Sequence, residues 1–148
     1  MGKGERGCTV LDLNERPTER DETRLIRVLV VDDDAAVGEA LRRVLKAFDV
    51  VFTQSVSGAL GRIQAGARFD AIVCDYLMPG MTGIEFHGAL ENTAPELARR
   101  LIFVTGYSSR PAVKQFVQRK GIVCLGKPFH TGELCDAVRA AATSEPAR

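Results

Sequence analysis

The segment Val28-Leu29-Val30-Val31-Asp32-Asp33-Asp34 decides the fold of this 148-residue chain. Four consecutive bulky or β-branched residues are typical of a strand that is covered on both faces, as in a parallel sheet. Three aspartates follow at once and place carboxylates at the carboxyl end of that strand. The segment therefore predicts a buried parallel strand with an acidic end.

Four more apolar runs have the character of buried strands, and amphipathic segments alternate with them. The strand-like runs are 50–53, 71–74, 101–104 and 122–125. Apolar residues at helical spacing predict helices over 35–48, 57–65, 83–90, 111–120 and 131–142, with a shorter one after Pro95. A serine at the start of the 57–65 helix and a threonine at the start of the 131–142 helix are expected to cap them.

Strand and helix alternate five times, which predicts an α/β fold with right-handed crossovers and a parallel sheet covered on both faces. Five strands are too few for an eight-stranded barrel, so we expect an open, doubly wound five-stranded sheet with five helices. Ligands of such sheets bind beyond the carboxyl ends of the strands.

Composition excludes several classes of function. The chain has 20 basic and 19 acidic residues, a formal charge of +1, which argues against binding nucleic acid or an anionic membrane surface through a broad field. No apolar run approaches the ~20 residues that cross a bilayer. The four cysteines lack CxxC spacing and are expected to be reduced thiols of a cytoplasmic protein.

Charge is concentrated at the amino-terminal end. Residues 1–24 hold five basic and six acidic side chains, too polar a composition to bury a core. We expect a disordered charged leader or linker over 1–24, one folded domain over 25–142 and a flexible tail over 143–148.

Chemically active side chains follow four of the five predicted strands. They are Asp32, Asp33 and Asp34 after the first, Asp75 after the third, Thr105 at the end of the fourth and Lys127 shortly after the fifth. The second strand ends in Thr53-Gln54, which looks chemically quiet and suits an edge position. Because the carboxyl ends of parallel strands share one edge, these groups should converge there.

The converging groups suit phosphoryl chemistry. Clustered carboxylates raise one another's pKa unless a cation neutralises them, and their oxygen ligands suit Mg²⁺. A metal ion with a lysine can receive a dianionic phosphoryl group, to which the Thr105 hydroxyl can bond. Either an aspartate is phosphorylated or a bound phosphate ester is cleaved.

Four motifs, in order and at matching spacing, resemble the receiver domain of two-component response regulators over roughly residues 25–142. They are Val-Leu-Val-Val-Asp-Asp-Asp (28–34), Cys-Asp-Tyr-Leu-Met-Pro-Gly-Met-Thr-Gly (74–83), Val-Thr-Gly (104–106) and Gly-Lys-Pro-Phe (126–129). The resemblance implies a flavodoxin-like, CheY-like sheet of strand order 2-1-3-4-5. It also implies a domain that takes a phosphoryl group from a histidine kinase or a histidine phosphotransfer protein and changes conformation to signal. Such a domain is no enzyme beyond its own phosphorylation and dephosphorylation.

The resemblance also assigns metal ligands and the phosphoacceptor. Asp75 is expected to accept the phosphoryl group. Asp33, Asp75 and the backbone carbonyl of Leu77 are expected to bind Mg²⁺ directly, whereas Asp32 acts through a bound water. The turn over 78–83 presents the Leu77 carbonyl.

The remaining positions follow from the same resemblance. Lys127 is expected to pair with the phosphoryl oxygens and Thr105 to bond one of them. The Lys127–Pro128 peptide is typically cis in this family, which X–Pro bonds tolerate. Asp34 lies just outside the usual acidic pair and is interpreted as a helix cap.

Two departures from the family pattern have functional consequences. Cys124 stands where the family often has an aromatic switch residue, so we hypothesise that movement of the loop 105–110 carries the signal instead. Leu77 and Tyr107 border the position of the hydrolytic water, and neither is an acid or an amide able to orient it. A phosphoryl group that lasts minutes or longer is therefore expected.

Two other functions compete with this interpretation. A haloacid-dehalogenase-like phosphatase normally has a second aspartate two residues after its nucleophile, where this chain has Leu77. A degenerate receiver fold would act as a binding module that needs no phosphorylation, although the acceptor residues are all present.

The resemblance also implies two partner surfaces and two possible architectures. The kinase or phosphotransfer protein should meet residues 35–40 and 129–131, and a homodimer could form through the fourth helix, fifth strand and fifth helix, over 110–120 and 133–139. The chain is either a stand-alone regulator or a piece of a larger protein such as a hybrid histidine kinase.

Overall fold

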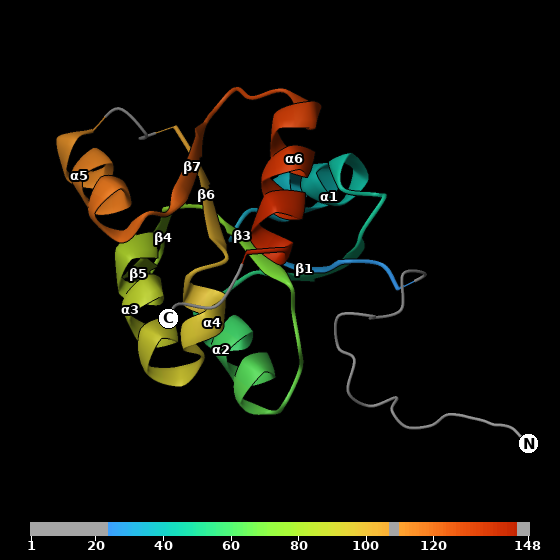
Figure 1. Cartoon of the computed structure of the whole chain (residues 1–148), viewed down its shortest axis with the longest axis horizontal. Helices are drawn as coiled ribbons and strands as arrows, with labels where there is room; N and C mark the ends of the chain where they lie inside the picture. Colours follow the sequence, from blue (N-terminus) through green and yellow to red (C-terminus); the bar gives the residue numbers. More distant parts are fainter. Residues whose placement is uncertain (1–23, 107–109, 145–148) are drawn as a thin grey trace, which may run out of the picture.

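The computed structural model describes residues 24–106 and 110–144 as an α/β sandwich (Figure 1). The leader expected over 1–24 lies outside these residues except for Arg24, and the tail expected over 143–148 lies outside them except for its first two positions. Tyr107 also lies outside the described ranges.

One parallel sheet of five strands forms the centre. The strands are β1 (Arg27–Val31), β2 (Asp49–Thr53), β3 (Ala71–Cys74), β6 (Leu101–Thr105) and β7 (Val123–Gly126). Their spatial order is β2-β1-β3-β6-β7, with every neighbouring pair parallel. This arrangement confirms the predicted open sheet, its strand order and the edge position of the second strand.

Within the described ranges, six helices cover the two faces of the sheet. They are α1 (Ala35–Val44), α2 (Val56–Gln64), α3 (Gly83–Thr93), α4 (Pro95–Ala98), α5 (Pro111–Lys120) and α6 (Thr131–Ala142). The five longer helices correspond to the five predicted ones, and α4 is the shorter helix predicted after Pro95. Among the described residues, none of these helices has the length and apolar character needed to cross a bilayer.

The pleat of β1 explains why its four apolar residues are all fully buried. Val28 and Val30 pack in one apolar cluster with side chains of α1 and α6, whereas Leu29 and Val31 pack in a second cluster with side chains of α2, α3 and α5. Successive residues of a strand point to opposite faces, so a central strand needs an apolar residue at every position.

Several local predictions are corrected. A two-stranded antiparallel hairpin, β4 (Leu77–Met78) with β5 (Met81–Thr82), fills the segment that the sequence predicts as a turn. Ser55 rather than Ser57 caps α2, since its Oγ accepts from the Gly58 amide at 2.9 Å.

The ends of two other helices also differ from the expected ones. Helix α1 ends at Val44 instead of Phe48, because Phe48 reaches the core through a turn after the helix and is buried there. His130, not a threonine, is the N-cap residue of α6, and its amide donates to Glu133 Oε1 at 2.9 Å.

Candidate functional site

Three carboxylates meet at the carboxyl edge of the sheet. One oxygen each from Asp32, Asp33 and Asp75 lies within 4.8 Å of the other two. The sheet brings them together because β1 and β3 are paired neighbours, with Val31 opposite Cys74. The Asp75 amide extends that ladder by donating to the Val31 carbonyl at 3.2 Å.

Asp32 is the buried member of the three, with 1% of its surface exposed. Its Oδ1 accepts from the Asp34 amide at 2.9 Å, whereas its Oδ2 is buried and has no hydrogen-bond partner within the described part of the chain. Burial raises the pKa of Asp32 most, the Asp34 amide lowers it, and the charge of Asp75 raises it again. A buried carboxylate oxygen without a donor, beside two more carboxylates, is a fitting ligand set for a hard cation.

Asp34 has a different role from its two neighbours. Its Oδ1 accepts from the Ala36 amide at 2.9 Å, which makes it the N-cap of α1. This confirms the interpretation of Asp34 as a helix cap. The cap also fixes the backbone that donates to Asp32.

Lys127 and Thr105 reach the same edge from the last two strands. Lys127 Nζ lies 3.7 Å from Asp75 Oδ2, and the Lys127 amide donates to the Thr105 carbonyl at 3.0 Å. Thr105 ends β6 opposite Gly126 of β7 and is fully buried. The Lys127–Pro128 peptide is cis, as expected.

The β4–β5 hairpin borders the cluster. Its first residue, Leu77, is 46% exposed, and the Leu77 amide donates to Asp75 Oδ1 at 3.4 Å. Gly80 turns the hairpin with a φ of 86°, a conformation that favours glycine. Leu77 thus contacts the phosphoacceptor candidate through its backbone and leaves its side chain toward solvent.

Gln54 contributes a contact that the sequence did not predict. Its Nε2 donates to the Asp33 carbonyl at 3.3 Å, so the residue after the second strand supports the backbone of the acidic segment. The register Val31 opposite Thr53 puts the next residue of β2 beside the acidic segment. The predicted strand order makes these two strands neighbours, but the contact depends on their register, which the sequence does not give.

Two cysteines lie near the site but differ in surroundings. Cys74 is buried in the core, as expected, with its Sγ 3.1 Å from the Asp75 carbonyl. Burial is the main cause that raises the pKa of the Cys74 thiol. Cys124 is partly buried against the same core cluster.

The fold and the site together define an α/β protein with three clustered carboxylates at a sheet edge and a lysine beside one of them. A family model for the response regulator receiver domain matches residues 28–139. The chain belongs to this family. It therefore has a phosphoacceptor role in two-component signalling and represents a signalling domain rather than a classical enzyme.

Individual relatives agree with this assignment. The hydrogenase transcriptional regulatory protein HoxA of Cupriavidus necator is 34% identical over 119 residues, covering 80% of this chain and 24% of HoxA. The transcriptional regulatory protein FixJ of Azorhizobium caulinodans is 34% identical over 115 residues, covering 76% of this chain and 53% of FixJ. The chain thus spans between about a quarter and about half of these curated relatives.

A solved structure matches over nearly its whole length. The chemotaxis protein CheY4 of Vibrio cholerae superposes with a TM-score of 0.68 at 28% identity, covering 79% of this chain and 98% of CheY4. Receiver domains generally bind Mg²⁺ in an acidic pocket, and the three carboxylates form such a pocket here.

Proposed function

We propose that Asp75 is the residue that accepts the phosphoryl group. The observation that carries this choice is its contact with Lys127, whose Nζ lies 3.7 Å from Asp75 Oδ2. Asp32 is buried, with 1% of its surface exposed, so it is a poor nucleophile toward a partner protein. Asp75 is only partly exposed, with 18% of its side chain accessible, and still has a neighbouring cation for the incoming charge.

The transfer is a displacement at phosphorus. A carboxylate oxygen of Asp75 forms a bond to the phosphorus of a phosphohistidine, while the bond between phosphorus and the histidine nitrogen breaks. That nitrogen leaves with the electron pair. Lys127 then pairs with the phosphoryl oxygens, and the Thr105 hydroxyl donates to one of them. The same domain catalyses only this step and the later hydrolysis of its own acyl phosphate.

The acidic cluster would hold Mg²⁺. Its ligands would be Asp33, Asp75 and the Leu77 carbonyl, with Asp32 acting through a water. The bound ion supplies positive charge that offsets both the carboxylates and the transferred phosphoryl group. The unpartnered Oδ2 of Asp32 supports this assignment.

Partner contacts follow from the same site. A histidine kinase or a histidine phosphotransfer protein would dock over 35–40 and 129–131, which border the acidic cluster and Lys127. A homodimer would use α5, β7 and α6. Because Cys124 replaces the aromatic switch residue, loop 105–110 would carry the conformational signal, and its residues 107–109 lie outside the described ranges.

The experiment compares Asp75→Asn with Asp34→Asn, since both remove one acid from the same edge. The full chain is incubated with Mg²⁺ and phosphoramidate, whose phosphorus–nitrogen bond resembles that of phosphohistidine. Intact-mass spectrometry should show one hydroxylamine-labile phosphoryl group on the parent and on Asp34→Asn, and none on Asp75→Asn. Phosphorylation of Asp75→Asn would refute the assignment, and release of many phosphates per chain would favour the phosphatase alternative.

A further inference from the structure

A cleft opens at the edge of the sheet opposite Asp75. It has a volume of about 590 Å³ and lies between the end of α2, the segment 66–70 that leads to β3, and α4. Asp70 and Arg100 line it and directly precede β3 and β6. Asp75 follows the other end of β3 and Thr105 ends β6, so the length of a strand, roughly 13–17 Å, separates the two places.

The floor of the cleft is hydrophobic and anchored in the core. It consists of Ile63, Ala67, Phe69, Ala94 and Leu97. Phe69 is 7% exposed and Leu97 8% exposed, and both belong to the main core cluster, so neither can move freely. Small-molecule sites typically have ~300–1,000 Å³. This cleft lies within that range and combines a hydrophobic floor with a charged rim.

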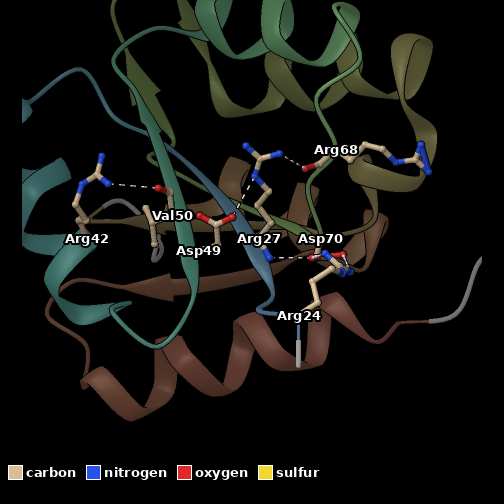
Figure 2. Close-up of polar contacts among 7 residues, drawn as sticks. All are labelled: Arg24, Arg27, Arg42, Asp49, Val50, Arg68 and Asp70. Atoms are coloured by element: carbon tan, nitrogen blue, oxygen red, sulfur yellow. Dashed lines mark hydrogen bonds and ion pairs between the residues drawn. The ribbon is translucent and has the colours of Figure 1, made fainter. Parts of the chain in front are cut away.

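Arginines dominate the rim, and the nearby acid Asp70 does not neutralise all of them. Asp70 Oδ2 accepts from the Arg27 amide at 2.8 Å and from Arg24 Nη1 at 3.2 Å (Figure 2). Asp70 Oδ1 accepts from Arg24 Nη2 at 3.4 Å. Both oxygens of this carboxylate therefore already accept hydrogen bonds from Arg24 or Arg27, and neither binds Arg68.

Arg68 and Arg100 are left without a carboxylate within residues 24–106 and 110–144. The backbone carbonyl of Arg68 accepts from Arg27 Nη1 at 3.4 Å, but the guanidinium of Arg68 makes no hydrogen bond or ion pair in this part of the chain. Figure 2 shows that guanidinium pointing away from Arg27 and Asp70. Arg100 Nη2 donates to the Ser144 carbonyl at 3.2 Å, which uses one of the five donors of its guanidinium. Glu96 is the one other acid that lines the cleft, and it is exposed.

Further basic residues lie at the same edge of the sheet, and three of them, Arg42, Lys120 and Arg139, pair with acids on the surface. Helices α1, α2, α5 and α6 carry arginine or lysine in their last turns, and helix ends lie at the same edge as the starts of the strands. Cations at helix ends complement the helix dipole and so have a structural reason. Arg68 lies in the loop between α2 and β3, where that reason does not apply. An edge rich in positive charge draws anions toward the cleft.

We propose that this cleft binds an amphipathic organic anion. Its compact apolar body would lie on Phe69 and Leu97, and its carboxylate, phosphate or sulfonate group would bind Arg68 and Arg100 through charge-assisted hydrogen bonds. Such a ligand gives the domain a second chemical input at the edge of the sheet away from Asp75. The inference is independent of which aspartate is phosphorylated.

The test uses the full chain and two matched probes. Anilinonaphthalene sulfonate has an apolar body and an anionic group, and phenylnaphthylamine has a similar body without the charge. We expect the sulfonate to bind at a ratio of one to one and to shift amide NMR signals of 66–70 and 94–100 while leaving those of 32–34 and 75 in place. The neutral probe should bind about tenfold more weakly, a difference of about 1.4 kcal/mol.

Variants separate the site from the general field. Arg68→Gln should weaken sulfonate binding about tenfold, and Arg43→Gln, an exposed arginine in the last turn of α1, should leave it unchanged. Arg100→Gln gives a second measurement at the rim, and circular dichroism verifies that each variant is folded. Four results would overturn the proposal. Two concern the site: equal weakening of binding by Arg43→Gln and Arg68→Gln, or NMR shifts outside the cleft. The other two are several bound probes per chain, and NMR shifts that depend on protein concentration without a probe, which would indicate that a second copy covers the cleft.

Discussion

Replacing Asp32 by asparagine should stabilise the metal-free domain while removing its response to Mg²⁺. Asp32 is 1% exposed and lies in a cluster of three carboxylates whose oxygens are within 4.8 Å of one another. The substitution removes the buried charge but keeps an oxygen that can accept from the Asp34 amide. Its new amide group can donate to the neighbouring carboxylates of Asp33 and Asp75.

The magnitude follows from the separation of the charges. Two unit charges 4.8 Å apart repel by about 3.5 kcal/mol at an effective dielectric constant near 20. Lys127 offsets part of this repulsion, and solvent screens Asp33, which is exposed. We therefore expect Asp32→Asn to raise the free energy of unfolding by about 1–2 kcal/mol without metal, or about 4 °C in melting temperature for each kcal/mol.

Added Mg²⁺ should reverse the order of the two proteins. An ion that binds only the folded state at 100 times its dissociation constant stabilises that state by about 2.7 kcal/mol, more than the advantage of metal-free Asp32→Asn. The parent domain should gain this amount and Asp32→Asn much less. The assay is urea or thermal unfolding followed by circular dichroism, with chelator and with a Mg²⁺ titration.

Asp34→Asn is the matched control because it removes a neighbouring charge that caps α1 and lies outside the cluster. Asparagine caps helices about as well as aspartate, so this variant should keep the Mg²⁺ response. A metal-free Asp32→Asn protein that is less stable than the parent, or that gains as much stability from Mg²⁺, would refute the electrostatic reasoning.

Three further predictions concern pH, phosphoryl lifetime and packing. His87 is 4% exposed, and burial holds its pKa below the ordinary 6.5 despite the nearby Glu91. As the pH falls, the unfolded state therefore takes up this proton before the folded state does, and the free energy of unfolding should decrease below about pH 6.5. Urea titrations at several pH values should show a smaller decrease in His87→Leu. Leu77→Asn places an amide beside the acyl phosphate and should shorten its lifetime about tenfold. This acceleration is smaller than the ~10²–10⁴-fold rate enhancement typical of a well-placed general base. Equally slow decay of labelled phosphate in both proteins would contradict this expectation. Gly83→Ala puts a Cβ 2.7 Å from the ring of buried Phe103 and should cost about 1–3 kcal/mol in urea unfolding, whereas an unchanged midpoint would show that the ring can yield.

The sequence predicts most of the fold because the central strands are buried on both faces. In β1, Val28 to Val31 must all be apolar, and this leaves a short continuous run of bulky and β-branched residues that is recognisable as a strand. The same parallel arrangement predicts that Asp32, Asp75 and Lys127 converge, since each follows a strand of one sheet. The observed cluster and the contact between Asp75 and Lys127 agree with that expectation.

The features that the sequence does not predict depend on contacts made across the fold. The β4–β5 strands have two residues each, too few for a pattern, and the Gly83 amide fixes their position by donating to the Tyr76 carbonyl. Ser55 and Ser57 are chemically equal as caps, and only the backbone geometry selects Ser55. Gln54 gains its role from the register between two neighbouring strands.

The two boundaries of the described domain lie at the same cleft. Arg24 lines the cleft and pairs with Asp70, while Arg100, also at the cleft, donates to Ser144 close to the end of the last helix. Any domain joined to a longer chain before Arg24 or after Ser144 would be tethered on that side of the sheet. The acidic cluster lies at the other ends of the strands, so it would face away from such a domain.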